Sequence, residues 1–288
     1  MSDGYRYRIV DVFTQSALEG NALAVFPDGA AVDERLMLPI AREMNLSETV
    51  FVLPPARPDC AQRLRIFTTR QELRFAGHPT VGAAWILLDE GMVPQGASQF
   101  SLDEPVGPIP VRRDAEGLIW LTTPAITFGP TCDPGLCADA LGLDRGDLLD
   151  IPPQMVGAGN RMIFVPLRNN EAVDRASLDL QGYRRMKGPD AQPAGVFVFA
   201  PRPEGAYSRM FAPELGVVED PATGSATGPL AAFMMRHGLA LSAPGTRWIS
   251  EQGAKMGRRS LLHVHIANDN AIEVGGHVTP VAQGVLRV

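Results

Sequence analysis

An internal repeat is the feature of this sequence that most restricts its fold. Four patterns of the first half recur in the second half in the same order: Gly20-Asn21 as Gly159-Asn160, Arg65-Ile-Phe67 as Arg209-Met-Phe211, the spacing Glu72, Gly77, Thr80 as Glu219, Gly224, Thr227, and the apolar stretch VGAAWILL as GPLAAFMM. Four ordered matches indicate duplication, whereas a single match could arise by chance. The sequence therefore predicts two similar halves that meet near Thr123–Pro130, where TTPAITFGP is typical of a linker.

Short strands separated by turns account for most of the predicted elements. Gly and Pro together make 54 of the 288 residues (29 and 25), which suits many tight turns. Alternating apolar residues predict strands over 5–13, 22–26, 49–53, 63–68, 118–122, 161–165, 196–200, 207–211, 247–250, 261–266 and 285–288. Helical periodicity predicts helices over 34–44, 80–90, 136–141, 175–186 and 226–237. Pro39 lies inside the first of these, so that helix is expected to start late or to kink.

Charge and composition restrict the class of partner. The net charge is −6, the isoelectric point is near 5.4, and no long run of like charges occurs. These values give no electrostatic basis for binding nucleic acid or a membrane, so a small molecule is the expected partner. No signal peptide or membrane-spanning stretch is recognisable, and three cysteines form neither a disulfide framework nor a zinc motif. A cytoplasmic location is expected.

The two glycine-led helix starts, at Gly77 and Gly224, suggest a binding site for an anion. Glycine allows close approach of a ligand to the main chain, and the first N–H groups of a helix lack partners within the helix. Two such starts facing each other would bind a small carboxylate. Each helix dipole contributes about 0.3–1 kcal/mol, which orients a substrate but does not transform it.

Four polar side chains could supply the chemistry. Glu48, in MNLSETVF, lies among apolar neighbours that would raise its pKa towards the range of a general acid or base. His78 and its counterpart Ser225 follow the two glycines, and Asp220 precedes the second helix start. Each also has a structural interpretation: Glu48 as an exposed turn residue, His78 as a hydrogen-bonded histidine near a helix start, and Asp220 as part of an Asp-Pro turn. From the residues alone, both interpretations stay open.

Longer motifs resemble a known family. NLSETVF, ELRFAGHPTVGAA, EDPATGSA and QGAKMGRRS are similar to the PhzF family of phenazine-biosynthesis-like isomerases, and the resemblance spans essentially the whole chain. It implies an α+β, diaminopimelate epimerase-like fold, in which each half wraps a curved, mostly antiparallel sheet around a central helix. The halves would be residues 1–123, completed by about 277–288, and residues 124–276. A homodimer, a small carboxylate substrate and no metal or cofactor are also expected.

The same resemblance assigns roles to residues of this chain. Glu48 corresponds to the acid/base glutamate of the family, and Asp220 and His78 are predicted to take part in catalysis with it. The predicted substrate-binding residues are Gly77, Gly224, Ser225, Asn21 and Thr223.

Three functions are compatible with these residues. The first is an isomerase that shifts a proton within an unsaturated carboxylate, as trans-2,3-dihydro-3-hydroxyanthranilate isomerase does. The second is an epimerase or racemase of an amino or hydroxy acid. Diaminopimelate epimerases use one cysteine at each of the two helix starts, and the resemblance places His78 and Ser225 at these positions, so a two-cysteine mechanism is disfavoured. The third is a non-catalytic ligand-binding scaffold. The basic run Lys255, Arg258 and Arg259 is interpreted as a solvated hairpin rather than an anion site.

Overall fold

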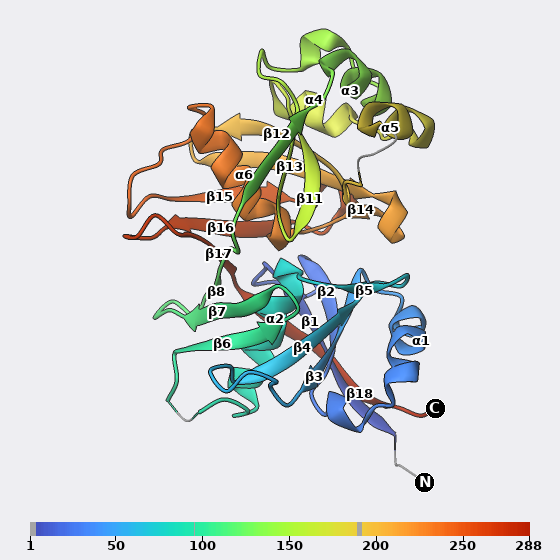
Figure 1. Cartoon of the computed structure of the whole chain (residues 1–288), viewed down its shortest axis with the longest axis vertical. Helices are drawn as coiled ribbons and strands as arrows, with labels where there is room; N and C mark the ends of the chain where they lie inside the picture. The colour runs from blue at the N-terminus through green and yellow to red at the C-terminus, as the bar shows by residue number, and fades with distance from the viewer. Residues whose placement is uncertain (1–3, 95, 189–191) are drawn as a thin grey trace.

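The chain forms two lobes stacked along its long axis, each built around one helix (Figure 1). The computed structural model describes residues 4–94, 96–188 and 192–288. In the first lobe the strands are β1 (Tyr5–Val12), β2 (Asn21–Phe26), β3 (Glu48–Leu53), β4 (Gln62–Phe67), β5 (Glu72–Leu73), β6 (Gln99–Glu104), β7 (Gly107–Arg113) and β8 (Ile119–Thr122). In the second lobe they are β9 (Thr127–Thr131), β10 (Gln154–Ala158), β11 (Asn160–Pro166), β12 (Gly195–Arg202), β13 (Gly205–Ala212), β14 (Val217–Asp220), β15 (Arg247–Gln252), β16 (Ser260–Ile266) and β17 (Ile272–Gly276). The last strand, β18 (Val278–Leu286), returns to the first lobe and pairs with β1.

Strand pairing repeats between the lobes. The order β18-β1-β2-β3-β4-β6-β7-β8 in the first lobe matches β9-β10-β11-β12-β13-β15-β16-β17 in the second. Parallel pairs fall at equivalent places, β2–β3 and β4–β6 against β11–β12 and β13–β15, and the other pairs of the two series are antiparallel. The predicted fold of two similar halves is therefore confirmed. Because β8 pairs with β17 across the lobes, the predicted division at residues 123 and 276 cuts one continuous sheet and stays a prediction.

One ion pair occurs in both lobes, and its two residues belong to two of the repeated sequence patterns. Arg65 forms a two-bond pair with Glu72, with both nitrogen–oxygen distances 2.8 Å, and Arg209 forms the same pair with Glu219 at the same distances. Arginine and carboxylate suit this parallel geometry because the guanidinium is a planar fork. The duplication thus preserved side-chain partners as well as the order of the strands.

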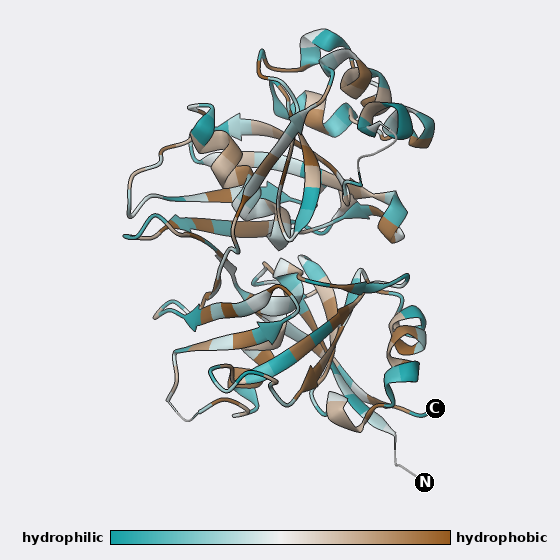
Figure 2. Cartoon of the chain, in the orientation of Figure 1, coloured by the Kyte–Doolittle hydropathy of each residue, from teal (hydrophilic) through white to brown (hydrophobic). Residues whose placement is uncertain are grey.

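The central helices are α2 (Gly77–Asp89) and α6 (Gly224–Arg236), and ten of the thirteen residues are buried in each. A helix that is apolar all round must be covered on every side, and the curved sheets provide that cover. The outer helices are α1 (Glu34–Met44), α3 (Pro134–Leu141), α4 (Asn170–Arg175) and α5 (Leu180–Lys187), with short 3-10 turns η1 (Gly29–Ala31), η2 (Arg145–Asp147), η3 (Pro213–Leu215) and η4 (Ala254–Met256). Figure 2 shows the outer helix α1 banded in apolar and polar colours, as expected for a helix with one face in water. In the described part of the chain, no helix combines the length and apolar character needed to span a membrane.

Two local predictions were wrong. The helix predicted over 175–186 begins only at Leu180, because Asp179 accepts a hydrogen bond from the N–H of Gly182 and caps the helix there, while α4 ends at Arg175. The linker predicted at 123–130 contains most of β9, whose pairing with β10 overrides its Pro and Gly content. Of the two alternatives for the helix around Pro39, the late start is excluded, because the helix begins at Glu34, where Asp33 accepts from the N–H of Arg35; the kink stays a prediction.

Candidate active site

The starts of the two central helices touch each other at the junction of the lobes. A Cβ atom placed on Gly77 would lie 2.4 Å from the carbonyl carbon of Gly224 and 2.5 Å from the nitrogen of Ser225. Only glycine permits this approach. No side chain caps the first turn of either helix in the described structure, so main-chain N–H groups of both helices are available to a ligand at one place.

Each lobe also holds the helix start of the other lobe through its Gly-Asn pair. The side-chain amide of Asn21 donates to the carbonyl of Ala222 at 2.9 Å, two residues before α6 begins. The amide of Asn160 donates to the carbonyl of Phe75 at 2.8 Å, two residues before α2 begins. The repeated asparagine is therefore a reciprocal clamp across the lobes, a role that the repeat alone did not reveal.

Glu48 and His78 form a buried carboxyl–imidazole pair. Glu48 begins β3, after the left-handed turn at Asn45, and its Oε2 atom lies 3.5 Å from Nδ1 of His78. The side chain of Glu48 keeps 15 % of its surface exposed and that of His78 keeps 3 %. Burial raises the pKa of Glu48 well above its ordinary value, and the nearby charge of Asp220 adds to this. Burial lowers the pKa of His78 to about 3, so its ring is neutral at neutral pH.

The position of Asn21 indicates which ring nitrogen of His78 carries the hydrogen. Its Nδ2 atom lies 2.8 Å from Oδ1 of Asp220 and 2.9 Å from the carbonyl of Ala222, and 3.3 Å from Nδ1 of His78. The two shorter contacts use both hydrogens of the amide. We therefore assign the hydrogen of neutral His78 to Nδ1, facing Glu48.

Asp220, at the end of β14, is surrounded by hydrogen-bond donors. Thr223 Oγ1 donates to its Oδ2 at 2.5 Å and Asn21 donates to its Oδ1. Burial nevertheless raises the pKa of Asp220 to about 6, and the hydrogen bonds from Thr223 and Asn21 limit the rise. Gln252 supports the same group, since its Nε2 donates to the carbonyl of Asp220 at 2.7 Å and to Thr223 Oγ1 at 3.0 Å.

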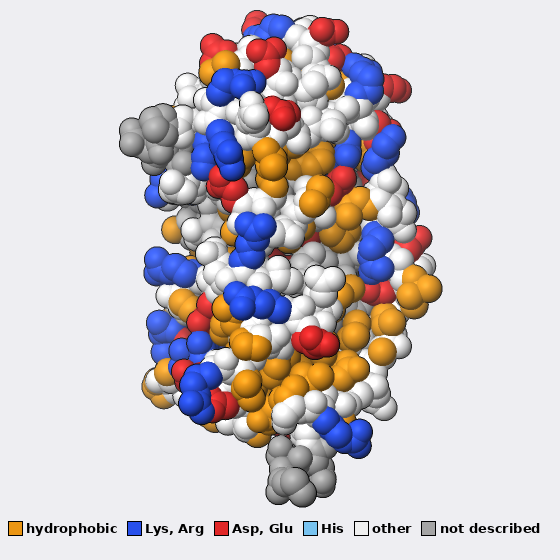
Figure 3. All heavy atoms as spheres, turned by 90° about the vertical axis from the view of Figure 1, so that its right-hand side faces the viewer, with side chains coloured by type: hydrophobic (Ala, Val, Ile, Leu, Met, Phe, Trp, Pro, Cys, Tyr) orange, Lys and Arg blue, Asp and Glu red, His pale blue; other side chains and the backbone are white. Residues whose placement is uncertain are grey.

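The predicted polar residues lie around a small pocket that continues into a larger cleft. The inner pocket, of about 30 Å³, is lined by the predicted residues Glu48, Asp220, Thr223 and Ser225, by Thr68 and Asn160, and by apolar side chains. That volume holds about one water molecule. The outer cleft, of about 840 Å³, shares four lining residues with it: Leu73, Asn160, Ala194 and Leu215. A ring-sized ligand therefore requires the inner pocket to widen. Figure 3 shows one face of the molecule, with basic side chains on both lobes near the junction.

The structure brings all eight predicted site residues together. Four line the inner pocket, and Asn21, His78, Gly77 and Gly224 contact those four or each other. Sequence reasoning missed Gln252 and Asn160, although both lie in motifs that it had singled out. Within the described residues, no group of three or more His, Cys, Asp or Glu side chains could hold a metal ion.

Comparisons with known proteins identify this arrangement. Two similar lobes, each a curved sheet around a central helix, meet at the starts of those helices, and this is the epimerase-like fold that the motifs implied. The chain belongs to the family of phenazine biosynthesis-like proteins, whose model matches residues 10–284. It is 36 % identical to an uncharacterized isomerase of Mesorhizobium japonicum (97 % of this chain, 98 % of that protein). It is 35 % identical to the trans-2,3-dihydro-3-hydroxyanthranilate isomerase of Pseudomonas aeruginosa (97 % and 98 %). A solved structure described as a predicted epimerase from Pseudomonas aeruginosa is 35 % identical, covers 99 % of both chains and has a TM-score of 0.82.

Proposed function

We propose that this protein is a cofactor-independent isomerase that moves a proton within a small unsaturated carboxylate; its similarity to proteins named trans-2,3-dihydro-3-hydroxyanthranilate isomerase supports the class of reaction. The observation that carries the proposal is the place of Glu48. Its carboxyl group lines a pocket at two helix starts, beside neutral His78, and burial brings its pKa towards the range in which one group both accepts and returns a proton.

The proposed reaction needs no redox partner. The substrate carboxylate binds the N–H groups at the starts of α2 and α6. Glu48 accepts a proton from one carbon, and the electron pair of that C–H bond delocalises over the adjacent double bond and carbonyl group. Glu48 then returns the proton to another carbon of the same system, so one C–H bond breaks and one forms. Such acid–base catalysis contributes about 10²–10⁴-fold, and exclusion of water between the lobes supplies more.

The neighbours of Glu48 have separate proposed roles. The Nδ1–H group of His78 orients the carboxylate, because it faces Oε2 at 3.5 Å. Asp220 binds an amino or hydroxyl group of the substrate, and Asn21, Thr223 and Ser225 position the rest. None of these groups is assigned as a second base, because Asp220 accepts hydrogen bonds from Asn21 and Thr223 and the low pKa of His78 makes it a weak base.

The epimerase alternative requires such a second base. At the start of α6 the equivalent position is Ser225, which is a weak acid and base without a partner. Cys60, Cys132 and Cys137 are absent from the residues that line the inner pocket. Proton transfer by one carboxyl group is therefore the better-supported reaction. Turnover in D₂O separates the two, because epimerisation inverts one carbon and labels it, whereas the proposed reaction moves a double bond.

The test is Glu48→Gln, which keeps the shape of the side chain and removes its acid–base function. We expect turnover of trans-2,3-dihydro-3-hydroxyanthranilate, or of another unsaturated carboxylate found by screening, to fall by at least about 10²-fold. Binding of a non-reacting carboxylate should change little. Glu43→Gln, an exposed position on α1, is the matched control. Unchanged turnover in Glu48→Gln would overturn the assignment of Glu48 as the acid–base group.

A further inference from the structure

The turn between β15 and β16, residues 252–260, lies between the two halves of the candidate site. At its start, Gln252 bonds to both Asp220 and Thr223, and its Oε1 accepts from the N–H of Thr223 at 3.1 Å. Gly253 has a φ of +74°, and a Cβ atom there would lie 2.6 Å from the carbonyl of Pro221. The turn is therefore packed directly against the chain that carries Asp220.

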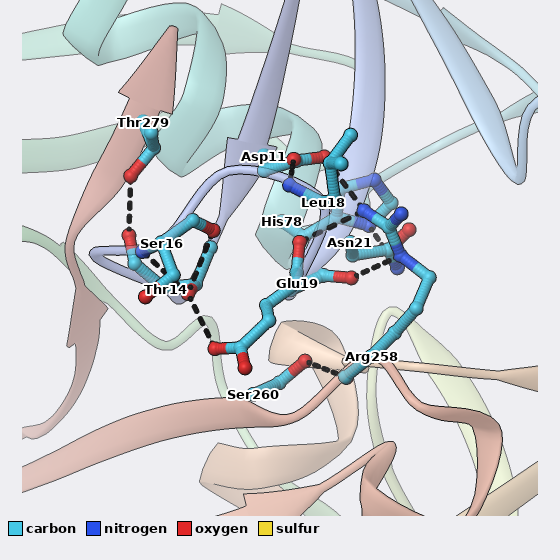
Figure 4. Close-up of polar contacts among 11 residues, drawn as sticks. Asp11, Thr14, Ser16, Leu18, Glu19, Asn21, His78, Arg258, Ser260 and Thr279 are labelled. Atoms are coloured by element: carbon cyan, nitrogen blue, oxygen red, sulfur yellow. Dashed lines mark hydrogen bonds and ion pairs between the residues drawn. The ribbon is translucent and has the colours of Figure 1, made fainter. Parts of the chain in front are cut away.

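At the end of the same turn, Arg258 reaches into the other lobe (Figure 4). Its Nη2 atom donates to Oδ1 of Asp11 at 2.6 Å and to the carbonyl of Glu19 at 2.8 Å, and its Nε donates to the carbonyl of Gly20 at 2.8 Å. The main chain repeats this link, since the N–H of Gly20 donates to the carbonyl of Arg259 at 3.1 Å. Arg258 is thus neither a solvated hairpin residue, as the sequence suggested, nor free to bind an anion.

Arg258 holds a loop whose conformation is strained. Residues 13–20 include Phe13, Leu18 and Gly20 with φ values of +67°, +71° and +65°. The left-handed region is unfavourable for Phe and Leu, so this loop needs outside support to persist. Asp11 supplies part of it by accepting from the N–H of Leu18 at 2.6 Å, and Arg258 in turn fixes Asp11.

The loop leads directly into Asn21, the first residue of β2. Gly20, whose carbonyl and N–H are both bound by the turn, is its immediate neighbour in the chain. Asn21 then donates to Asp220 from the first lobe, while Thr223, held by Gln252, donates to Asp220 from the second lobe. One nine-residue turn therefore supports two donors of the Asp220 carboxylate, Asn21 and Thr223, while Ser47 is a third donor that the turn does not hold.

We propose that Arg258 is a positioning residue of the site: it fixes the loop 13–20 so that the amide of Asn21 donates to Asp220. The effect of Arg258 on turnover rests on the proposed function, but its effect on the protonation of the Asp220 carboxylate does not. Without Arg258 the loop relaxes, Asn21 loses its fixed direction, and Asp220 loses one of the hydrogen bonds that favour its charged form. Glu48 and Glu219, the other acidic groups near Asp220, are the same in every variant compared below.

The experiment compares Arg258→Met with Arg259→Met. Arg259 belongs to the same turn and loses the same charge, but it pairs with Glu251 at the surface. The measurement is the titration of the Asp220 carboxyl carbon by ¹³C NMR, assigned by its absence in Asp220→Asn. We expect the Asp220 pKa to rise by about one pH unit in Arg258→Met, a tenfold change in proton affinity, and to stay within a few tenths of the wild-type value in Arg259→Met.

A second variant covers the case in which Arg258→Met does not fold. Arg258→Lys keeps the charge beside Asp11 but lacks the fork needed to bind both carbonyl groups as well, so the Asp220 pKa should still rise, by a smaller amount. An Asp220 titration equal to wild type in folded Arg258→Lys overturns the proposal, as does an equal shift in the Arg258→Met and Arg259→Met variants. Because the NMR titration needs no turnover, a negative result here is distinguishable from an incorrect isomerase assignment.

Discussion

Glu104 is a buried carboxyl group that the proposed reaction does not use, and it allows a quantitative prediction. It ends β6 and is 1 % exposed. Its Oε1 atom lies 2.6 Å from Oγ1 of Thr80, in the first turns of α2, and Thr80 Oγ1 lies 2.8 Å from the carbonyl of Ala76. Its Oε2 atom has no hydrogen-bond partner among the described residues. Burial raises the pKa of Glu104 from 4.5 to about 8.

At neutral pH Glu104 is therefore a neutral acid. Its O–H group donates to Thr80, whose hydroxyl donates to Ala76 at the start of α2. The unfolded chain releases this proton near pH 4.5 and the folded chain retains it until about pH 8. Between these values the folded state binds more protons than the unfolded state, so the free energy of unfolding falls as pH rises. The fall is complete above about pH 8 and amounts to at most about 5 kcal/mol, at about 1.4 kcal/mol per pH unit.

The perturbation that isolates this effect is Glu104→Gln. The amide keeps the donor to Thr80 and cannot ionise, so the pH-dependent loss disappears. Urea unfolding followed by circular dichroism at several values from pH 5 to pH 9 gives the difference in free energy of unfolding between variant and wild type. Contributions of Glu48 and Asp220 are common to both proteins and cancel. From pH 5 to pH 9, we expect the wild type to lose several kcal/mol of unfolding free energy relative to Glu104→Gln.

Glu116→Gln, at an exposed position, controls for the loss of one carboxylate. A Glu104→Gln difference that is the same at pH 5 and pH 8 would show that Glu104 is ionised in the folded protein, and the reasoning from burial would then be refuted.

Two further predictions concern the repeated motifs. Gly77→Ala should destabilise the protein by about 1–3 kcal/mol and weaken carboxylate binding, because the added Cβ would meet the main chain of Gly224. Gly146→Ala should do neither, because open space surrounds Gly146. Thermal unfolding measures the change in stability, and ligand titration measures the change in binding. Arg209→Met should cost about 3–5 kcal/mol of unfolding free energy, because Arg209 also donates to three main-chain carbonyl groups. Arg65→Met should cost about 1 kcal/mol, because it breaks only ion pairs with Glu72 and Glu34. Equal costs in urea unfolding would contradict this difference in hydrogen bonding.

Site residues could be predicted from sequence where the residue type, in its local sequence context, has few structural roles besides the functional one. Glycine before an apolar helix indicated close approach at Gly77 and Gly224, and the structure places these glycines against each other. A glutamate among apolar residues indicated a raised pKa at Glu48, and burial produces that shift. Gln252 could not be selected, because a glutamine in a strand carries no signal until Asp220 and Thr223 lie beside it.

The amino-acid sequence by itself determined the duplication, the two buried helices and most short strands, because these depend on local periodicity and on spacings that the repeat preserves. Only the tertiary structure decided that β9 is a strand and that Arg258 links to Asp11 rather than to water. These features depend on contacts between residues more than 20, or more than 200, positions apart in the chain. Hydrogen bonds and ion pairs of that kind are specified by which surfaces meet when the lobes close, and local patterns of polarity do not contain that information.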